Sequence, residues 1–161
     1  MRKSKSILFL TESAMIAALY AALTLVTGQF SVSVFQLRLS EALTVLPVFT
    51  PAAVPGLAVG CLTANLLSSC APLDTVIGAL STLAAAVLTR CLRKRPLCAV
   101  LPPAFVNAAV LPLIFLYVYH FDGTYGFFFF SVLVSEALTA GLLGYALFRT
   151  LDRYRDRLFH L

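Results

Sequence analysis

The sequence predicts an all-α, polytopic membrane protein with six transmembrane helices, the second of which is short. Of its 161 residues, 60% are hydrophobic and 12% are charged, and the mean hydropathy is +0.93. Soluble domains average about 25% charged residues, and a soluble chain of this length has no interior large enough for so much apolar surface. Eleven of the twelve lysines and arginines lie in three clusters that flank long apolar runs. This is the pattern of cytoplasmic loops in membrane proteins.

The apolar runs define a single domain whose segments alternate across the membrane. Helices are expected over residues 7–27, 37–49, 55–69, 74–90, 97–119 and 127–149, followed by a basic tail over 150–161. Six crossings place the three basic clusters and both termini on the cytoplasmic side. Helix 37–49 is limited by Pro47 and Pro51 and covers about 20 Å, less than the bilayer core of about 30 Å. A short charged helix is tolerated only where protein buries it or where it lines a cavity.

The first helix carries two rows of small residues. Ala14, Ala18 and Ala22 form one row at i,i+4 spacing, and Ala17 and Ala21 form the other. Small residues at this spacing let helix backbones approach closely in lipid. Each row therefore predicts a helix contact, either within this chain or with a partner helix.

The stretch from Gln36 to Pro47 places Arg38 and Glu41 among apolar residues. Its Ser-Glu-Ala-Leu-Thr segment recurs at 135–139, where it supplies Glu136. A charge at bilayer depth costs about 2.5–3.5 kcal/mol or more and usually marks a pathway or a binding site. The two glutamates are therefore the leading candidates for ligand contact.

Three further polar residues, Asn65, Asp74 and Asn107, lie with the charged ones in the outer half or near the middle of their helices. This distribution predicts a pocket that opens outward, because a channel needs polar groups down to the inner face. Structural alternatives exist for these residues except Glu136, whose own segment offers no basic neighbour. Arg38 and Glu41 are spaced to neutralise each other, Asp74 is placed to cap the fourth helix, and the asparagines suit interhelical hydrogen bonds.

Several classes of function are excluded. The chain has no Ser/His/Asp set, no metal-spaced His or Cys cluster and no phosphate-binding glycine loop. Its four cysteines lack CxxC spacing, so neither a metal nor a disulfide framework is expected. The basic residues follow helix ends, which argues against nucleic acid as a partner. No enzymatic activity and no cofactor are expected, and active transport would need energy from another subunit.

One family resemblance covers essentially the whole chain. The residues that carry it are the Gln36–Pro47 stretch, Pro51, Val54-Pro55-Gly56, Gly60-Cys61, Ala64-Asn65 and the segment from Asp74 to Gly78. They resemble the QueT family, the substrate-binding (S) components of energy-coupling factor (ECF) transporters linked to queuosine precursors. The resemblance implies a bacterial plasma-membrane protein that pairs with a transmembrane coupling subunit and two cytoplasmic ATPases, which use the ATP. The implied ligand is 7-aminomethyl-7-deazaguanine or a relative such as queuine.

The resemblance also implies roles for residues. Alanines of the first helix, Ala14, Ala18 and Ala22 or the neighbouring Ala17 and Ala21, would contact the coupling subunit, and the loop Gly28–Phe35 would cover the ligand. A deazaguanine edge offers two adjacent donors that a carboxylate accepts in bidentate fashion, and its aminomethyl cation suits a second carboxylate. Tyr20, Phe35 or Phe105 would stack on the ring. The expected ligand-binding residues are Tyr20, Gln36, Arg38, Glu41, Asn65, Asp74, Asn107 and Glu136.

Two alternatives remain open at this point. The chain is an S component for another small heterocycle, such as a vitamin, or a structural membrane protein whose charges only brace its helices. In the second case no ligand stabilises the protein.

Overall fold

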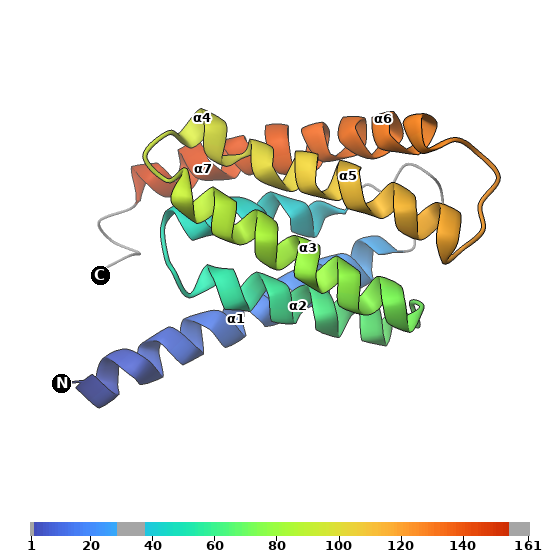
Figure 1. Cartoon of the computed structure of the whole chain (residues 1–161). Coiled ribbons are helices and arrows are strands. Elements are labelled where there is room, and N and C mark those ends of the chain that lie inside the picture. The colour runs from blue at the N-terminus through green and yellow to red at the C-terminus, as the bar shows by residue number, and fades with distance from the viewer. Residues whose placement is uncertain (1, 29–37, 155–161) are drawn as a thin grey trace.

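The computed structural model describes residues 2–28 and 38–154 of the chain (Figure 1). All its described elements are helical, which confirms the all-α class. In order they are α1 (Arg2–Gly28), η1 (Leu39–Val48), α2 (Ala53–Leu67), α3 (Pro72–Cys91), α4 (Pro96–Ala99), α5 (Leu101–Tyr117), α6 (Tyr125–Glu136), η2 (Ala137–Leu143) and α7 (Gly144–Arg153).

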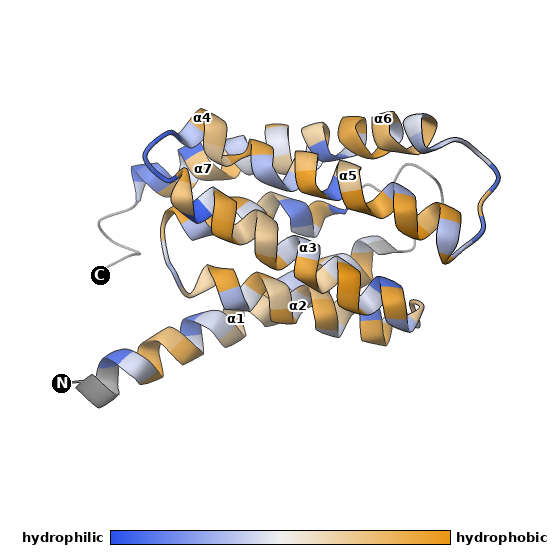
Figure 2. Ribbon diagram, viewed as in Figure 1, coloured by the Kyte–Doolittle hydropathy of each residue, from blue (hydrophilic) through white to orange (hydrophobic). Residues whose placement is uncertain are grey.

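Four described helical spans are long and apolar enough to cross a membrane: Lys5–Thr27, Pro72–Cys91, Pro96–Tyr117 and Tyr125–Arg153. The colouring in Figure 2 is mostly hydrophobic along these helices and hydrophilic at the turns that join them. Two further helices, η1 and α2, are apolar but shorter. The chain is therefore a multi-pass membrane protein. That η1 and α2 also cross the membrane, which would make six crossings, stays a prediction.

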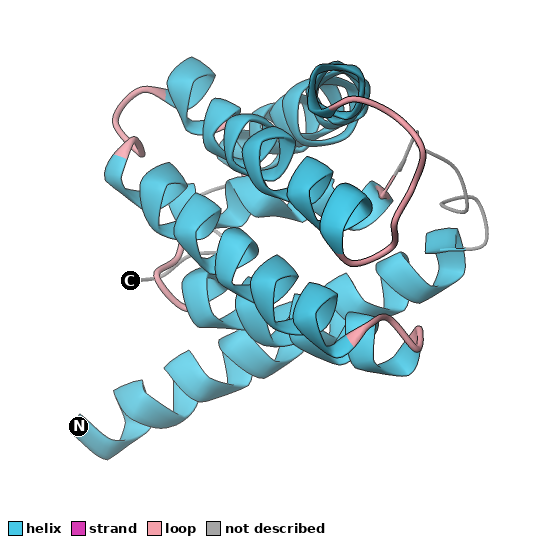
Figure 3. Ribbon diagram, turned by 45° about the vertical axis from the view of Figure 1, so that its right-hand side comes forward, coloured by secondary structure: helices cyan, strands magenta, loops and turns pink. Residues whose placement is uncertain are grey.

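The short charged helix predicted from the sequence lies at the centre of the bundle. Helix η1 contacts α1, α2, α3, α7 and η2, and all but two of its ten residues are buried. Figures 1 and 3 show α3 beside η1, with α2 on one side of α3 and α5 on the other. The N-terminal part of α1 extends away from the bundle in both views.

Helix η1 differs in kind from the helix that the sequence predicts. It begins at Leu39 and has 3-10 geometry, in which Phe49 N donates to Leu46 O at 2.9 Å. In an α-helix the ring of Pro47 would clash with the carbonyl four residues earlier. Ten residues of 3-10 helix rise about 20 Å, so the predicted length holds although the geometry does not.

The last two predicted helices are also interrupted. The fifth is divided at Val100 into α4 and α5, with Pro102 and Pro103 in the first turn of α5. The sixth contains a π-helical segment, η2, directly after Glu136. Such π segments occur often at functional sites, and this one directly follows the buried carboxylate residue Glu136.

Helices α1 and α2 cross at two glycines. A Cβ atom on Gly60 would lie 2.8 Å from the carbonyl oxygen of Ala17, and one on Gly56 would lie 2.8 Å from that of Ser13. Ala17 thus lies against α2, and Ala21 is buried. The other row, Ala14, Ala18 and Ala22, is exposed. The two rows therefore face in different directions, one into the bundle and one outward.

The crossing predicts a large stability effect for a small change. Gly60→Ala is expected to lower the free energy of unfolding by about 1–3 kcal/mol, the usual effect of overpacking, because backbone atoms of α1 cannot move aside. The measurement is thermal unfolding in detergent. Gly126→Ala is the matched control, because a Cβ there meets nothing within 4 Å. Equal melting temperatures for the two variants would contradict the close crossing.

Candidate functional site

A cavity lies between η1, α2, α3, α5 and α6, and five predicted site residues line it. They are Arg38, Glu41, Asp74, Asn107 and Glu136. The structure therefore brings together residues that span about a hundred positions of the chain. The cavity measures about 10 Å³, roughly the space that one water molecule needs. A ring system enters only if the lining side chains separate.

Glu136 has one satisfied oxygen and one unsatisfied oxygen. Asn107 Nδ2 donates to its Oε1 at 2.6 Å. Its Oε2 is buried and has no hydrogen-bond partner among the described residues, and the residue is only 6% exposed. A buried polar atom without a partner costs about 1–3 kcal/mol, more if charged. This oxygen is therefore suited to accept a hydrogen bond from a molecule that enters the cavity.

Glu41 is oriented by the first helix. The hydroxyl of Tyr20 donates to its Oε1 at 2.5 Å, and next to it Thr24 Oγ1 donates to Ser40 Oγ at 2.7 Å. Tyr20 is completely buried and is not among the lining residues, so in this conformation its contact with the site is the hydrogen bond to Glu41. Arg38 lines the same cavity as Glu41.

Asp74 is held by Tyr119, which follows the end of α5. Tyr119 donates its hydroxyl to Asp74 Oδ2 at 2.7 Å and accepts from the backbone N–H of Ala71 at 3.3 Å. Burial and the hydrogen bond to Asp74 raise the pKa of Tyr119 to about 12, so the hydroxyl keeps its proton at neutral pH. The predicted capping role for Asp74 is wrong. Helix α3 begins at Pro72, its N-cap is Ala71, and Asp74 lies in its first turn.

Asn65 lies behind the cavity wall. A Cβ on Gly78, which lines the cavity, would lie 3.0 Å from Asn65 Nδ2. Asn65 itself is 1% exposed and its amide donates to Cys61 Sγ at 3.9 Å. In this conformation it supports α3 and does not reach the cavity.

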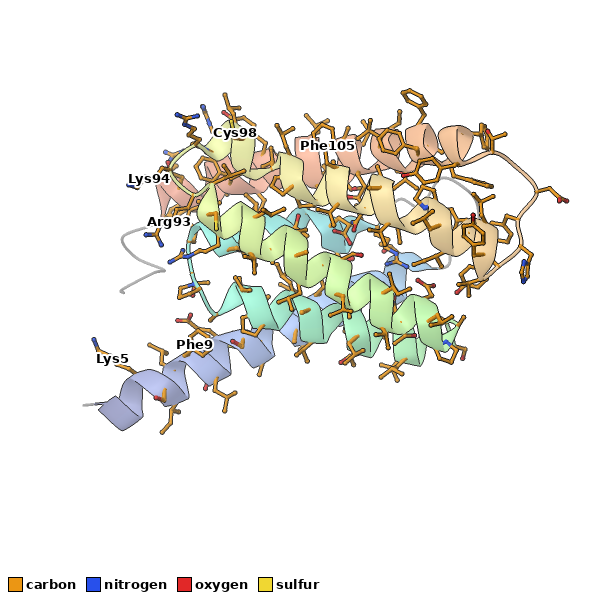
Figure 4. All side chains as sticks on the ribbon, in the orientation of Figure 1. Lys5, Phe9, Arg93, Lys94, Cys98 and Phe105 are labelled. Atoms are coloured by element: carbon orange, nitrogen blue, oxygen red, sulfur yellow. The ribbon has the colours of Figure 1, made fainter. Side chains whose placement is uncertain are left out.

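Other predictions concern aromatic residues and the loop after α1. Phe105 is 55% exposed on the outer side of α5 (Figure 4), and it is not among the lining residues of the cavity. Gln36, Phe35 and the remainder of the predicted lid after Gly28 lie outside the described residues.

Six lining residues were missed: Cys61, Gly78, Thr82, Leu111, Val132 and Ser135. A signal for them was present in the sequence. Apart from Ser135, which precedes Glu136, each lies four or eight positions from a polar residue that had been identified. Residues four apart share one face of a helix. The residues one or two turns from each polar residue, on the same helix face, therefore include the remaining lining residues.

The charge balance of the cavity favours a cationic, donor-rich molecule. Three carboxylates and one guanidinium line it. Within residues 2–28 and 38–154, no group of three His, Cys, Asp or Glu side chains is arranged to hold a metal ion.

A buried polar site inside a bundle of apolar helices is typical of membrane transport proteins. The sequence model of the QueT transporter family matches residues 10–153. The chain belongs to this family of membrane transporters, which confirms the resemblance found in its motifs. The matched range includes every lining residue of the cavity. No curated protein and no solved structure gave a significant match.

Proposed function

We propose that this protein is the S component of an ECF-type importer and captures a queuosine precursor for ATP-driven uptake. The ligand is 7-aminomethyl-7-deazaguanine or a related 7-deazaguanine such as queuine. The observation that carries this proposal is the unpaired Oε2 of Glu136, in a cavity that also holds Glu41 and Asp74.

The chemistry of the ligand matches that of the cavity. A deazaguanine presents two adjacent N–H donors, which the carboxylate of Glu136 accepts as a bidentate, charge-assisted pair. Accepting them uses the unpaired oxygen and competes with Asn107 for the other. The cationic aminomethyl group then lies near a second carboxylate, that of Glu41 or Asp74. A neutral purine has no cationic group to pair with this second carboxylate.

The ends of the bundle support an orientation. Lys5, Arg93 and Lys94 lie at the same end of the molecule (Figure 4), where α1 begins and α7 ends (Figure 1). Positively charged loops stay in the cytoplasm. We therefore assign this end of the molecule to the cytoplasmic side of a bacterial plasma membrane. The turn after α2 and the loop after α5 then face outward, with Asp74 at the outer side of the cavity.

The partner surface proposed for the coupling subunit is the outward row Ala14, Ala18 and Ala22. This row is exposed along α1, and residues from Lys5 to Thr11 are exposed all round. Small residues permit close approach of a second helix in lipid. The coupling subunit and two cytoplasmic ATPases would supply the energy, because the sequence contains no phosphate-binding glycine loop.

The test is a calorimetric titration of the purified protein in nanodiscs with aminomethyl-deazaguanine, queuine, guanine and thiamine. Tight binding of either of the first two ligands and much weaker binding of guanine are expected, because guanine lacks the cationic substituent that a second carboxylate of the cavity would bind. Preference for thiamine would assign the protein to a different heterocycle. Failure of all four to bind or to raise the melting temperature would overturn the proposal and favour a structural role.

A further inference from the structure

We propose that Arg90, at the cytoplasmic end of α3, is a positioning residue for the ligand site: it fixes η1 and thereby sets the place of Glu41. The inference rests on the proposed function in one respect, the role of Glu41 in ligand binding. The contact itself stands on the structure alone.

Arg90 reaches from one helix to the end of another. Its Nη1 donates to the carbonyl oxygen of Pro47 at 2.9 Å and to that of Val48 at 3.2 Å. These carbonyls belong to the last residues of η1, where a helix leaves its C=O groups without helical partners. A cation at this position also interacts favourably with the negative end of the helix dipole.

Helix η1 depends on contacts of this kind more than an α-helix does. Its 3-10 hydrogen bonds have poorer geometry, and 3-10 runs longer than three or four residues are uncommon. Pro47 lacks an N–H donor within it. The N-terminal part of the helix is tied to α1 by Tyr20 and Thr24, and Arg90 ties the C-terminal end to α3. Glu41 belongs to the first of these attachments, and Arg90 limits movement of the other end of the same helix.

The contact also joins two walls of the cavity. Helix α3 contributes Asp74, Gly78 and Thr82 to the lining, and η1 contributes Glu41. Arg90 lies two turns beyond Thr82 on the same helix and holds both walls in one arrangement. Its neighbours in the basic cluster, Arg93, Lys94 and Arg95, are exposed, so the positive-inside pattern accounts for them but not for the partly buried hydrogen bonds of Arg90.

The first experiment needs no ligand. Hydrogen–deuterium exchange is measured for Arg90→Gln and for its matched control Arg95→Gln, which removes the same charge from an exposed site. Arg90→Gln is expected to accelerate exchange of the η1 amides at least tenfold while those of α5 stay unchanged. Arg90→Lys, which keeps a donor, should be intermediate. Unchanged exchange in η1, or acceleration throughout the bundle, would overturn the positioning role.

The second experiment separates positioning from general stability with a double-mutant cycle. Arg90→Gln is expected to raise the Kd for aminomethyl-deazaguanine about tenfold. In a Glu41→Asp background, the same change should have less than a twofold effect, whereas in an Asn107→Ala background it should keep its tenfold effect. Equal effects in both backgrounds would show that Arg90 does not act through Glu41. If the wild-type protein binds no deazaguanine, the proposed function fails, and the exchange experiment alone decides the role of Arg90.

Discussion

Replacing Glu136 by glutamine is expected to abolish tight ligand binding while leaving the protein folded. In the variant, the amide oxygen still accepts from Asn107, so the NH₂ group takes the place of Oε2 and faces the donors of the ligand. Removing one partner of a buried, hydrogen-bonded charge pair costs about 2–5 kcal/mol. This corresponds to an increase in Kd of about 30-fold to several thousandfold.

Calorimetry in nanodiscs measures this effect, and melting curves establish that the variant is folded. The melting temperature of the ligand-free variant should match or exceed that of the wild type, because the change removes a buried carboxylate with an unpaired oxygen. Asp122→Asn is the matched control, since Asp122 is an exposed carboxylate in the loop before α6. Wild-type affinity in Glu136→Gln would show that the carboxylate of Glu136 does not bind the ligand.

Ala18→Leu is expected to abolish uptake without affecting ligand binding. Ala18 is the middle residue of the outward row on α1 and does not line the cavity. A leucine there holds a partner helix away from the backbone of α1, and close packing of small residues is the main source of helix association in lipid. We expect at least a tenfold loss of transport, with Kd within twofold of the wild type.

The measurements are uptake of radiolabelled ligand into cells that express the coupling subunit and the ATPases, and co-purification of these subunits. Ala18→Ser retains a small side chain at the same position and should transport normally. Normal uptake by the leucine variant would show that the partner docks elsewhere. Loss of both binding and uptake would show instead that Ala18 supports the fold.

Charged and polar residues made much of the site predictable from the sequence. In a chain this apolar, each intramembrane charge is costly and therefore informative, and Arg38, Glu41, Asp74, Asn107 and Glu136 all line one cavity. The same reasoning could not separate lining residues from supporting ones. Asn65 is as polar as Asn107, but it lies behind Gly78, and this difference depends on how α2 packs against α3.

Geometry set by tertiary contacts was not predictable. Apolar periodicity does not distinguish the 3-10 helix η1 or the π segment η2 from α-helix, because both conformations are stabilised by neighbouring elements. The role of Arg90 was hidden for a related reason. Every basic residue of its cluster is explained equally well by the positive-inside rule, and only the structure separates the one that bonds to η1.

The small volume of the cavity has a consequence for binding kinetics. A space of about 10 Å³ has to widen before a bicyclic ring enters, so association includes a conformational step. A required conformational change lowers the association rate. It also weakens the apparent affinity in proportion to the fraction of molecules that are open. Once the helices close around the ring, the same barrier slows its escape. The ligand's residence time, more than its rate of capture, then determines whether it is still bound when transport begins.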